Sequence, residues 1–170
     1  MPKGAEVRPA LVLVRKVICD TLMPYITDAH VLDLFAGTGA FVFEMISRGA
    51  KSAIAVDLDS KMANNIELNA KTFGVSHQIE VINSDYLRAL AHLAERGEGF
   101  DIIFVAPPFY GNYVNSSLDY IDKTGLLKKD GVLVAHYHKS DKVNHDRKQF
   151  MLWKCKAHGN SIMDFFKSVP

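Results

Sequence analysis

The sequence has little cysteine, and this scarcity bears on both metal binding and location. Only two cysteines occur among 170 residues, Cys19 and Cys155, and they lie far apart with no Cys-x-x-Cys spacing. The spacing argues against a disulfide framework and against a zinc site, so we expect no metal. So few cysteines are typical of a reducing compartment, and we therefore predict a cytoplasmic protein.

Long apolar runs and an excess of charge of one sign are also absent. The apolar stretch 10–14 stops at Arg15, and no run approaches the roughly 20 residues of a membrane span, so we predict neither a signal peptide nor a membrane partner. Lysine and arginine total 20 against 19 aspartates and glutamates, for a formal net charge of +1. Any nucleic-acid site must therefore be a local patch.

Apolar segments with strand-like and helix-like patterns alternate over most of the chain. Hydrophobic residues make up 48% of the sequence and charged residues 23%, which is typical of a globular protein. We expect one domain over residues 1–170. The alternation from Val31 to His136 predicts parallel βαβ units, and the continuous apolar run Ile102–Val105 fits a sheet buried on both faces.

The pattern predicts an α/β fold of the Rossmann type, with a mostly parallel twisted sheet and helices on both faces. A first helix is expected at about 9–23, ended by Pro24, followed by a core at about 31–138 and an antiparallel hairpin at about 149–167. The expected core strands are 31–35, 52–56, 78–82, 100–105 and 131–136, and the expected core helices are 40–48, 60–73, 86–96 and 118–124.

Ligands of such sheets bind beyond the carboxyl ends of the strands, so the residues that follow each strand are the candidate site. Gly37 and Gly39 permit a tight turn and close approach of a ligand. The third glycine of a dinucleotide motif is replaced by Val42, which disfavours a redox Rossmann protein and favours a smaller adenosyl ligand without phosphate. The candidate segments are 33–39, 57–59, 84–86 and 106–109.

Three aspartates follow strands and also precede helices. Asp57 is placed to accept hydrogen bonds from ribose hydroxyls, and Asp85 to accept from an adenine amine. Each of the three is alternatively a helix N-cap. We favour ligand binding for Asp57 and Asp85, because acidic strand ends converge on one crevice, and the cap for Asp59.

These segments resemble the motifs of S-adenosylmethionine (SAM)-dependent methyltransferases of class I. The chain is more narrowly similar to the RsmD family, which methylates the guanine N2 amine of 16S ribosomal RNA, and the similarity runs from about Arg8 to Lys167. The narrower resemblance is carried by Arg8-Pro9 with Arg15, by Asn69, and by the closing segment 156–161 with Phe165-Phe166.

The resemblance implies a role for each segment. SAM would be the cofactor, and ribosomal RNA within the small subunit the substrate and partner. Asp57, with Leu58 beside it, would take the ribose, Asp85 and Tyr86 would flank the adenine, and Pro107, Pro108 and Phe109 would form the wall where the base lands. The methionine part would lie on Asp33, Phe35, Ala36, Gly37, Thr38 and Gly39.

Ala106 departs from the family pattern at the catalytic position. The family carries Asp or Asn before the two prolines, where the side-chain oxygen accepts from the target amine, whereas alanine offers no acceptor. The substitution has three explanations: it was introduced by engineering, it marks a weaker or inactive relative, or another residue supplies the acceptor. Asn112 and Asn115 are the candidates for that replacement, but we prefer ordinary loop or cap roles for them. His136 also departs, since the family usually has Glu there, and it and His138 could hydrogen-bond near the cleft.

A local excess of basic residues in the region 139–156, with Tyr110 and Tyr113 in the adjoining loop as an aromatic rim, is the candidate RNA surface, and a merely solvated surface is an equal alternative. The residues we expect to contact RNA are Arg8, Arg15, Tyr110, Lys139, Lys142 and Arg147.

The sequence leaves other functions open: methylation of another amine nitrogen in DNA, protein or a small molecule, or a non-catalytic SAM- or RNA-binding role.

Overall fold

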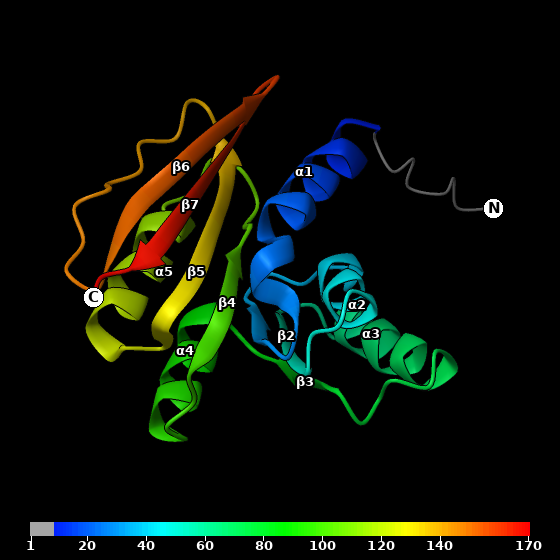
Figure 1. Cartoon of the computed structure of the whole chain (residues 1–170). Helices are drawn as coiled ribbons and strands as arrows, with labels where there is room; N and C mark the ends of the chain where they lie inside the picture. The colour runs from blue at the N-terminus through cyan, green and yellow to red at the C-terminus, as the bar shows by residue number, and fades with distance from the viewer. Residues whose placement is uncertain (1–8) are drawn as a thin grey trace.

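Seven strands form one sheet in a computed structural model that describes residues 9–170, so that Arg8 lies outside the described residues. The strand order is β3-β2-β1-β4-β5-β7-β6 (Figure 1). The strands are β1 (His30–Asp33), β2 (Ser52–Asp57), β3 (Ile79–Asn83), β4 (Phe100–Val105), β5 (Leu127–His138), β6 (Phe150–His158) and β7 (Ser161–Ser168).

Five helices cover the two faces of this sheet. They are α1 (Pro9–Ile26), α2 (Ala40–Ser47), α3 (Ser60–Thr72), α4 (Tyr86–Glu95) and α5 (Tyr113–Thr124). Buried side chains of α1, α2 and α3 pack in one apolar cluster, and those of α4 and α5 in a second cluster on the opposite face. Residues of β4 and β5 alternate between the two clusters, because successive side chains of a strand point to opposite faces.

The strand order reverses between β1 and β4, and this reversal positions the site. Strands β1 to β5 are parallel, so their carboxyl ends share one edge of the sheet. In open sheets of this kind the ligand crevice lies at such a switch point. β7 pairs antiparallel with both β5 and β6, which confirms the expected C-terminal hairpin and the mostly parallel α/β fold.

Two expected helix boundaries were wrong. Pro24 lies inside α1 rather than ending it, because the fixed φ of proline suits a helix and the fully buried Leu22 and Ile26 keep the last turn packed. α5 begins at Tyr113 and not at Leu118. No helix among residues 9–170 is long and apolar enough to cross a membrane.

Candidate functional site

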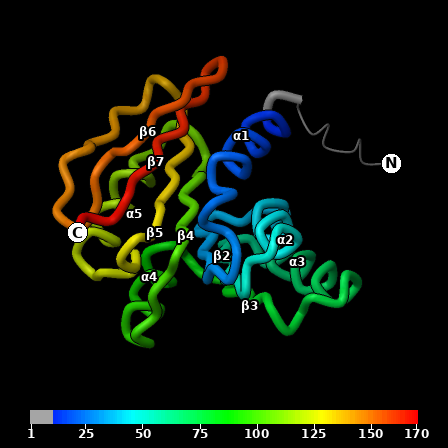
Figure 2. Tube along the Cα trace, in the orientation of Figure 1, coloured from blue at the N-terminus to red at the C-terminus, as the bar shows by residue number. Residues whose placement is uncertain are grey.

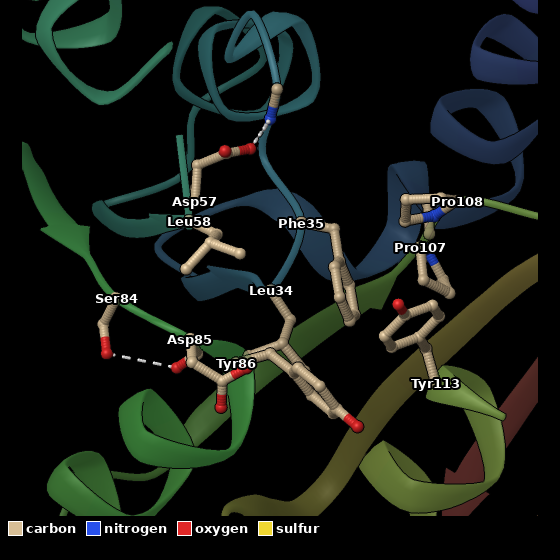
Figure 3. Close-up of a pocket in the computed structure, with 12 residues that line it drawn as sticks. Leu34, Phe35, Asp57, Leu58, Ser84, Asp85, Tyr86, Pro107, Pro108 and Tyr113 are labelled. Carbon is tan, nitrogen blue, oxygen red and sulfur yellow. Dashed lines mark hydrogen bonds between the residues drawn. The ribbon is translucent and has the colours of Figure 1, made fainter. Parts of the chain in front are cut away.

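The ends of four parallel strands meet around one cavity of about 410 Å³ (Figure 3). This volume lies within the range of small-molecule sites. The lining comes from the segments after β1, β2, β3 and β4 together with the first residue of α5, and the expected strand-end segments are thus brought together. The lining residues are Leu34, Phe35, Gly37, Asp57, Leu58, Ser84, Asp85, Tyr86, Ala106, Pro107, Pro108 and Tyr113.

Asp57 joins the turns after β1 and β2. Its Oδ2 accepts from the backbone N–H of Gly37 at 2.7 Å, and its Oδ1 accepts from that of Asp59 at 2.8 Å. Gly37 has a φ of 54°, in the left-handed region that glycine adopts without strain. Because each carboxylate oxygen has two lone pairs, both oxygens of Asp57 keep one acceptor site that can face a ligand.

Gly39 is the N-cap residue at which α2 begins, and it does not line the cavity. Its φ is 79°, and a Cβ placed there would lie 2.9 Å from Cγ1 of Ile66 in α3. The absence of a side chain therefore lets α2 begin close against α3. Thr38 is exposed and, like Gly39, is not among the lining residues.

Asp85 is the N-cap of α4 as well as a lining residue. Its Oδ1 accepts from the backbone N–H groups of Leu87 at 2.9 Å and Arg88 at 3.3 Å, which leaves Oδ2 without a hydrogen bond to the described residues. Capping and ligand binding are therefore compatible at this position. Asp59 is the N-cap of α3, accepting from Lys61 N–H at 2.8 Å, and that prediction is confirmed.

Three aromatic rings form one side of the cavity. The Phe35 ring centroid lies 5.1 Å from that of Tyr86 and 6.2 Å from that of Tyr113, and the two tyrosine rings lie 5.7 Å apart. Figure 3 shows these rings grouped together, with Asp57 and Ser84 lying apart from them. The sequence placed Tyr113 on an outer RNA rim; the earlier start of α5 turns it toward the cavity instead.

Asp33 and Ala36 line a second, smaller cavity of about 160 Å³ that shares Phe35 and Ala106 with the first. Arg15 and His136 line it as well. Asp33 is buried, and burial, with the nearby Asp57 adding, raises the pKa of its carboxyl to about 7. Burial lowers the pKa of His136, whose Nε2 lies 3.0 Å from the Ser161 hydroxyl, so the imidazole is neutral near pH 7.

Phe109 and Tyr110 turn away from the cofactor-sized cavity. They line a third cavity of about 440 Å³ with Leu11, His138 and the turn 158–161 between β6 and β7. Figure 2 shows this turn beside the start of α1. The Phe109 ring meets the rings of His136 and His138 at 5.7 and 5.4 Å. The two prolines thus line the cofactor-sized cavity, and the two residues that follow them line the aromatic one.

Asn112 and Asn115 do not replace the acceptor missing at Ala106. Asn115 Nδ2 donates to Asn112 Oδ1 at 3.1 Å and to the Lys142 carbonyl at 2.8 Å, and Asn115 Oδ1 accepts from Asn144 N–H at 2.9 Å. Neither residue lines the cavity that contains Ala106. The bonds of Asn115 hold the loop between β5 and β6 against α5, which agrees with the preferred interpretation of both residues as ordinary loop or cap residues.

The residues expected to contact RNA differ in how far their side chains are exposed to solvent. Lys139 and Lys142 are exposed, Tyr110 is 73% exposed, and Arg15 is partly buried. The Arg147 side chain is only 5% exposed and pairs with Asp119 of α5 at 2.6 Å, so its guanidinium faces the protein and the expectation of RNA contact does not fit. Within residues 9–170, no three His, Cys, Asp or Glu side chains are grouped to hold a metal.

Comparison with known proteins identifies a sequence family and a shared fold. The model of the family described as Conserved hypothetical protein 95 matches residues 1–167. The chain is 30% identical over 164 residues to the YlbH protein of Bacillus subtilis, covering 96% of this chain and 89% of that protein. It is 33% identical over 133 residues to the ribosomal RNA small subunit methyltransferase D of Haemophilus influenzae, covering 78% and 68%.

A solved structure agrees with these sequence matches. The yhhF protein from Escherichia coli superposes with a TM-score of 0.82 at 27% identity, over 95% of this chain and 87% of that one.

Proposed function

Because the chain belongs to the family described as Conserved hypothetical protein 95, we propose that it is a SAM-dependent methyltransferase acting on the exocyclic N2 amine of a guanine in 16S ribosomal RNA. One observation carries the proposal. The ends of β1 to β4 meet around a single cavity that has two carboxylates on its lining, and the two prolines on that lining are followed directly by Phe109, which lines an aromatic cavity.

The lining of the cofactor-sized cavity suits the charge of SAM. Asp57 and Asp85 line it, and among the described residues no lysine or arginine does. A nucleoside with a positive sulfonium is attracted by such a lining, whereas a pyrophosphate is repelled. SAM supplies an electrophilic methyl group on a sulfonium that is already a good leaving group.

The residues of this chain bind and orient the two reactants. The free acceptor sites of Asp57 take the ribose hydroxyls, and Oδ2 of Asp85 accepts from the adenine amine beside Tyr86. The turn 33–39 and Leu58 surround the rest of the cofactor. Holding the amine in line with the methyl carbon is the main contribution to the rate, because orientation alone can supply several kcal/mol.

The target amine lies next to Ala106 in this proposal. The Ala106 carbonyl is the acceptor that the substitution leaves in place, and the neutral imidazole of His136 lines the same small cavity. Phe109 supplies an aromatic surface for a base taken out of its helix. Ala106 also favours a second candidate function, a SAM- and RNA-binding relative with impaired catalysis.

One assay separates the two candidates. Small ribosomal subunits from a strain that lacks the modification are incubated with the protein and methyl-labelled SAM, and the modified nucleotide is identified after digestion. We expect label at guanine N2. Calorimetry with SAM is run in parallel on the unchanged protein and on the Asp57→Ala variant, which should bind SAM more weakly. Binding of SAM without any label transfer to these subunits would favour the impaired relative.

A further inference from the structure

The edge strand β6 has one face that α1 leaves open. Lys154 and Lys156 pair in register with Phe165 and Met163 of β7, which belong to the apolar cluster under α1. Residues paired across antiparallel strands point to the same face, so both lysines lie on the α1 side of the sheet. Lys156 Nζ donates to Thr21 Oγ1 of α1 at 2.8 Å, which confirms this placement.

Trp153 gathers two ammonium groups on this face. It lies at a register shift between Leu152 and Lys154, where a bulge re-aims a side chain. Lys167 Nζ lies 3.9 Å and Lys154 Nζ 4.6 Å from the ring centroid. Lys167 also lies 5.2 Å from the Tyr25 ring, which meets the indole edge-on at 6.0 Å. The two rings therefore hold positive charge in one place.

No carboxylate neutralises this cluster. Among the described residues, neither Lys154 nor Lys156 nor Lys167 takes part in a salt bridge. The only carboxylate of β7, Asp164, is fully buried and bonds to Tyr137 and His145 on the opposite face. Like charges held together repel one another, and an anion would relieve that repulsion.

Strand β6 leads from the lysine cluster to the aromatic cavity. β6 ends at His158, which lines the aromatic cavity with Phe109. From Trp153 to His158 the strand advances five residues, or roughly 17 Å at about 3.3 Å per residue. In Figure 1 the strand runs along the outer edge of the sheet toward the end where this cavity lies.

We propose that the open face of β6, formed by Tyr25, Trp153, Lys154, Lys156 and Lys167 and called here the β6 strip, binds the phosphate backbone of the RNA substrate. The proposal rests on the proposed function for the identity of the RNA. The positive charge of the β6 strip complements a polyanion. The strip also runs away from the aromatic cavity, so it can hold phosphates that lie along the RNA from a base at Phe109. Lysine contacts of this kind give affinity and position without reading sequence.

Trp153 provides a direct readout, because it is the only tryptophan in the chain. Its emission is followed while 16S ribosomal RNA transcribed in vitro is added to the unchanged protein. We expect a change of intensity or wavelength that saturates with RNA, and no change on adding SAM alone. Emission that stays constant while RNA binds would overturn the proposal.

A charge-removing variant tests the lysines. The triple variant Lys154→Gln, Lys156→Gln, Lys167→Gln is compared with the control Lys51→Gln, Lys71→Gln, Lys123→Gln, which removes three exposed lysines outside the strip. We expect the strip variant to bind RNA about tenfold or more weakly, with the salt slope of log K reduced by roughly 2–3. Equal affinity in the two triple variants would contradict the proposal.

Two further measurements separate the β6 strip from the rest of the site. SAM affinity, measured by calorimetry, should be unchanged in the strip variant, which also shows that it folds. If the unchanged protein binds RNA through the strip but transfers no methyl group, only the proposed function fails. If the strip variant loses binding to intact small subunits but keeps it for free RNA, the partner is a ribosomal protein and the strip proposal is wrong.

Discussion

At the scale of single residues, Asp33 places a carboxyl with a raised pKa beside the cofactor-sized cavity. Its folded pKa of about 7 lies above the unfolded value near 3.9, so its contribution to stability is fully present below the unfolded value and is lost as the pH rises through 7. The burial that raises this pKa follows from the position of Asp33 at the end of a central strand.

We expect SAM binding to release the proton of the Asp33 carboxyl, because the cationic methionine part favours the carboxylate. The SAM affinity of the unchanged protein should therefore rise between pH 6 and pH 8 more than that of Asp33→Asn. Calorimetry in buffers of different ionisation enthalpy measures the number of protons released for each SAM bound. Equal pH dependence of SAM binding in both proteins would show that Asp33 is not linked to SAM.

Asp33→Asn should also stabilise the fold by about 2–3 kcal/mol more at pH 8 than at pH 5.

Ala106 is the residue that limits the rate in the proposed mechanism. Ala106→Asp restores an acceptor for the target amine, and a preorganised hydrogen-bonding group of this kind typically changes the rate by on the order of 10²–10³. We expect kcat for methyl transfer to small subunits to rise, with little change in SAM affinity. Ala106→Leu adds bulk without an acceptor and is the control. If aspartate gives no gain, the backbone carbonyl and His136 already suffice.

At the scale of secondary structure, Asp85 serves both α4 and the cavity, and substitution can separate the two roles. Asp85→Asn keeps a good N-cap, so urea unfolding should change by less than about 0.5 kcal/mol, while SAM affinity falls because the carboxylate is lost. Asp85→Ala should lose SAM affinity and also about 1 kcal/mol of stability. If Asp85→Asn binds SAM as tightly as the unchanged protein does, the residue is a cap alone.

At the scale of the whole molecule, a net charge of +1 means that the proposed RNA binding must depend on local groups. Lys142 is exposed, whereas the buried Arg147 holds the β5–β6 loop on α5. Lys142→Gln should weaken RNA binding and lower its salt slope by roughly 0.7–0.9 without changing the unfolding midpoint. Arg147→Gln should lower stability by about 1–3 kcal/mol and leave the slope unchanged. A lower salt slope for Arg147→Gln, with unchanged stability, would show that Arg147 contacts the RNA.

The carboxyl-end segments were accessible to sequence reasoning because their positions follow from alternation alone. Once Val31–His136 is divided into βαβ units, the edge at which 33–39, 57–59, 84–86 and 106–109 meet is set by parallel pairing. The roles of their side chains remain predictions. Asp85 shows why: the same sequence position satisfies a helix cap and faces a ligand cavity.

The errors arose where long-range packing decides. Pro24 reads locally as a helix end, but burial of Ile26 against the core extends α1 past it. Tyr113 reads as a loop aromatic, but α5 starts there and brings its ring to Phe35. Arg147 reads as part of a basic surface, but Asp119, 28 residues away, draws it inward.

The order of elements, the parallel sheet with its terminal hairpin, and the strand ends that line the cavity follow from the amino-acid sequence, because they depend on periodicity and on turn residues close together in the chain. Three features depend instead on the folded arrangement: the pKa of Asp33, the burial of Arg147, and the contacts of Lys154 and Lys167 with Trp153. Desolvation and charge–ring contacts depend on neighbours that are distant in the chain, and folding alone brings those neighbours together.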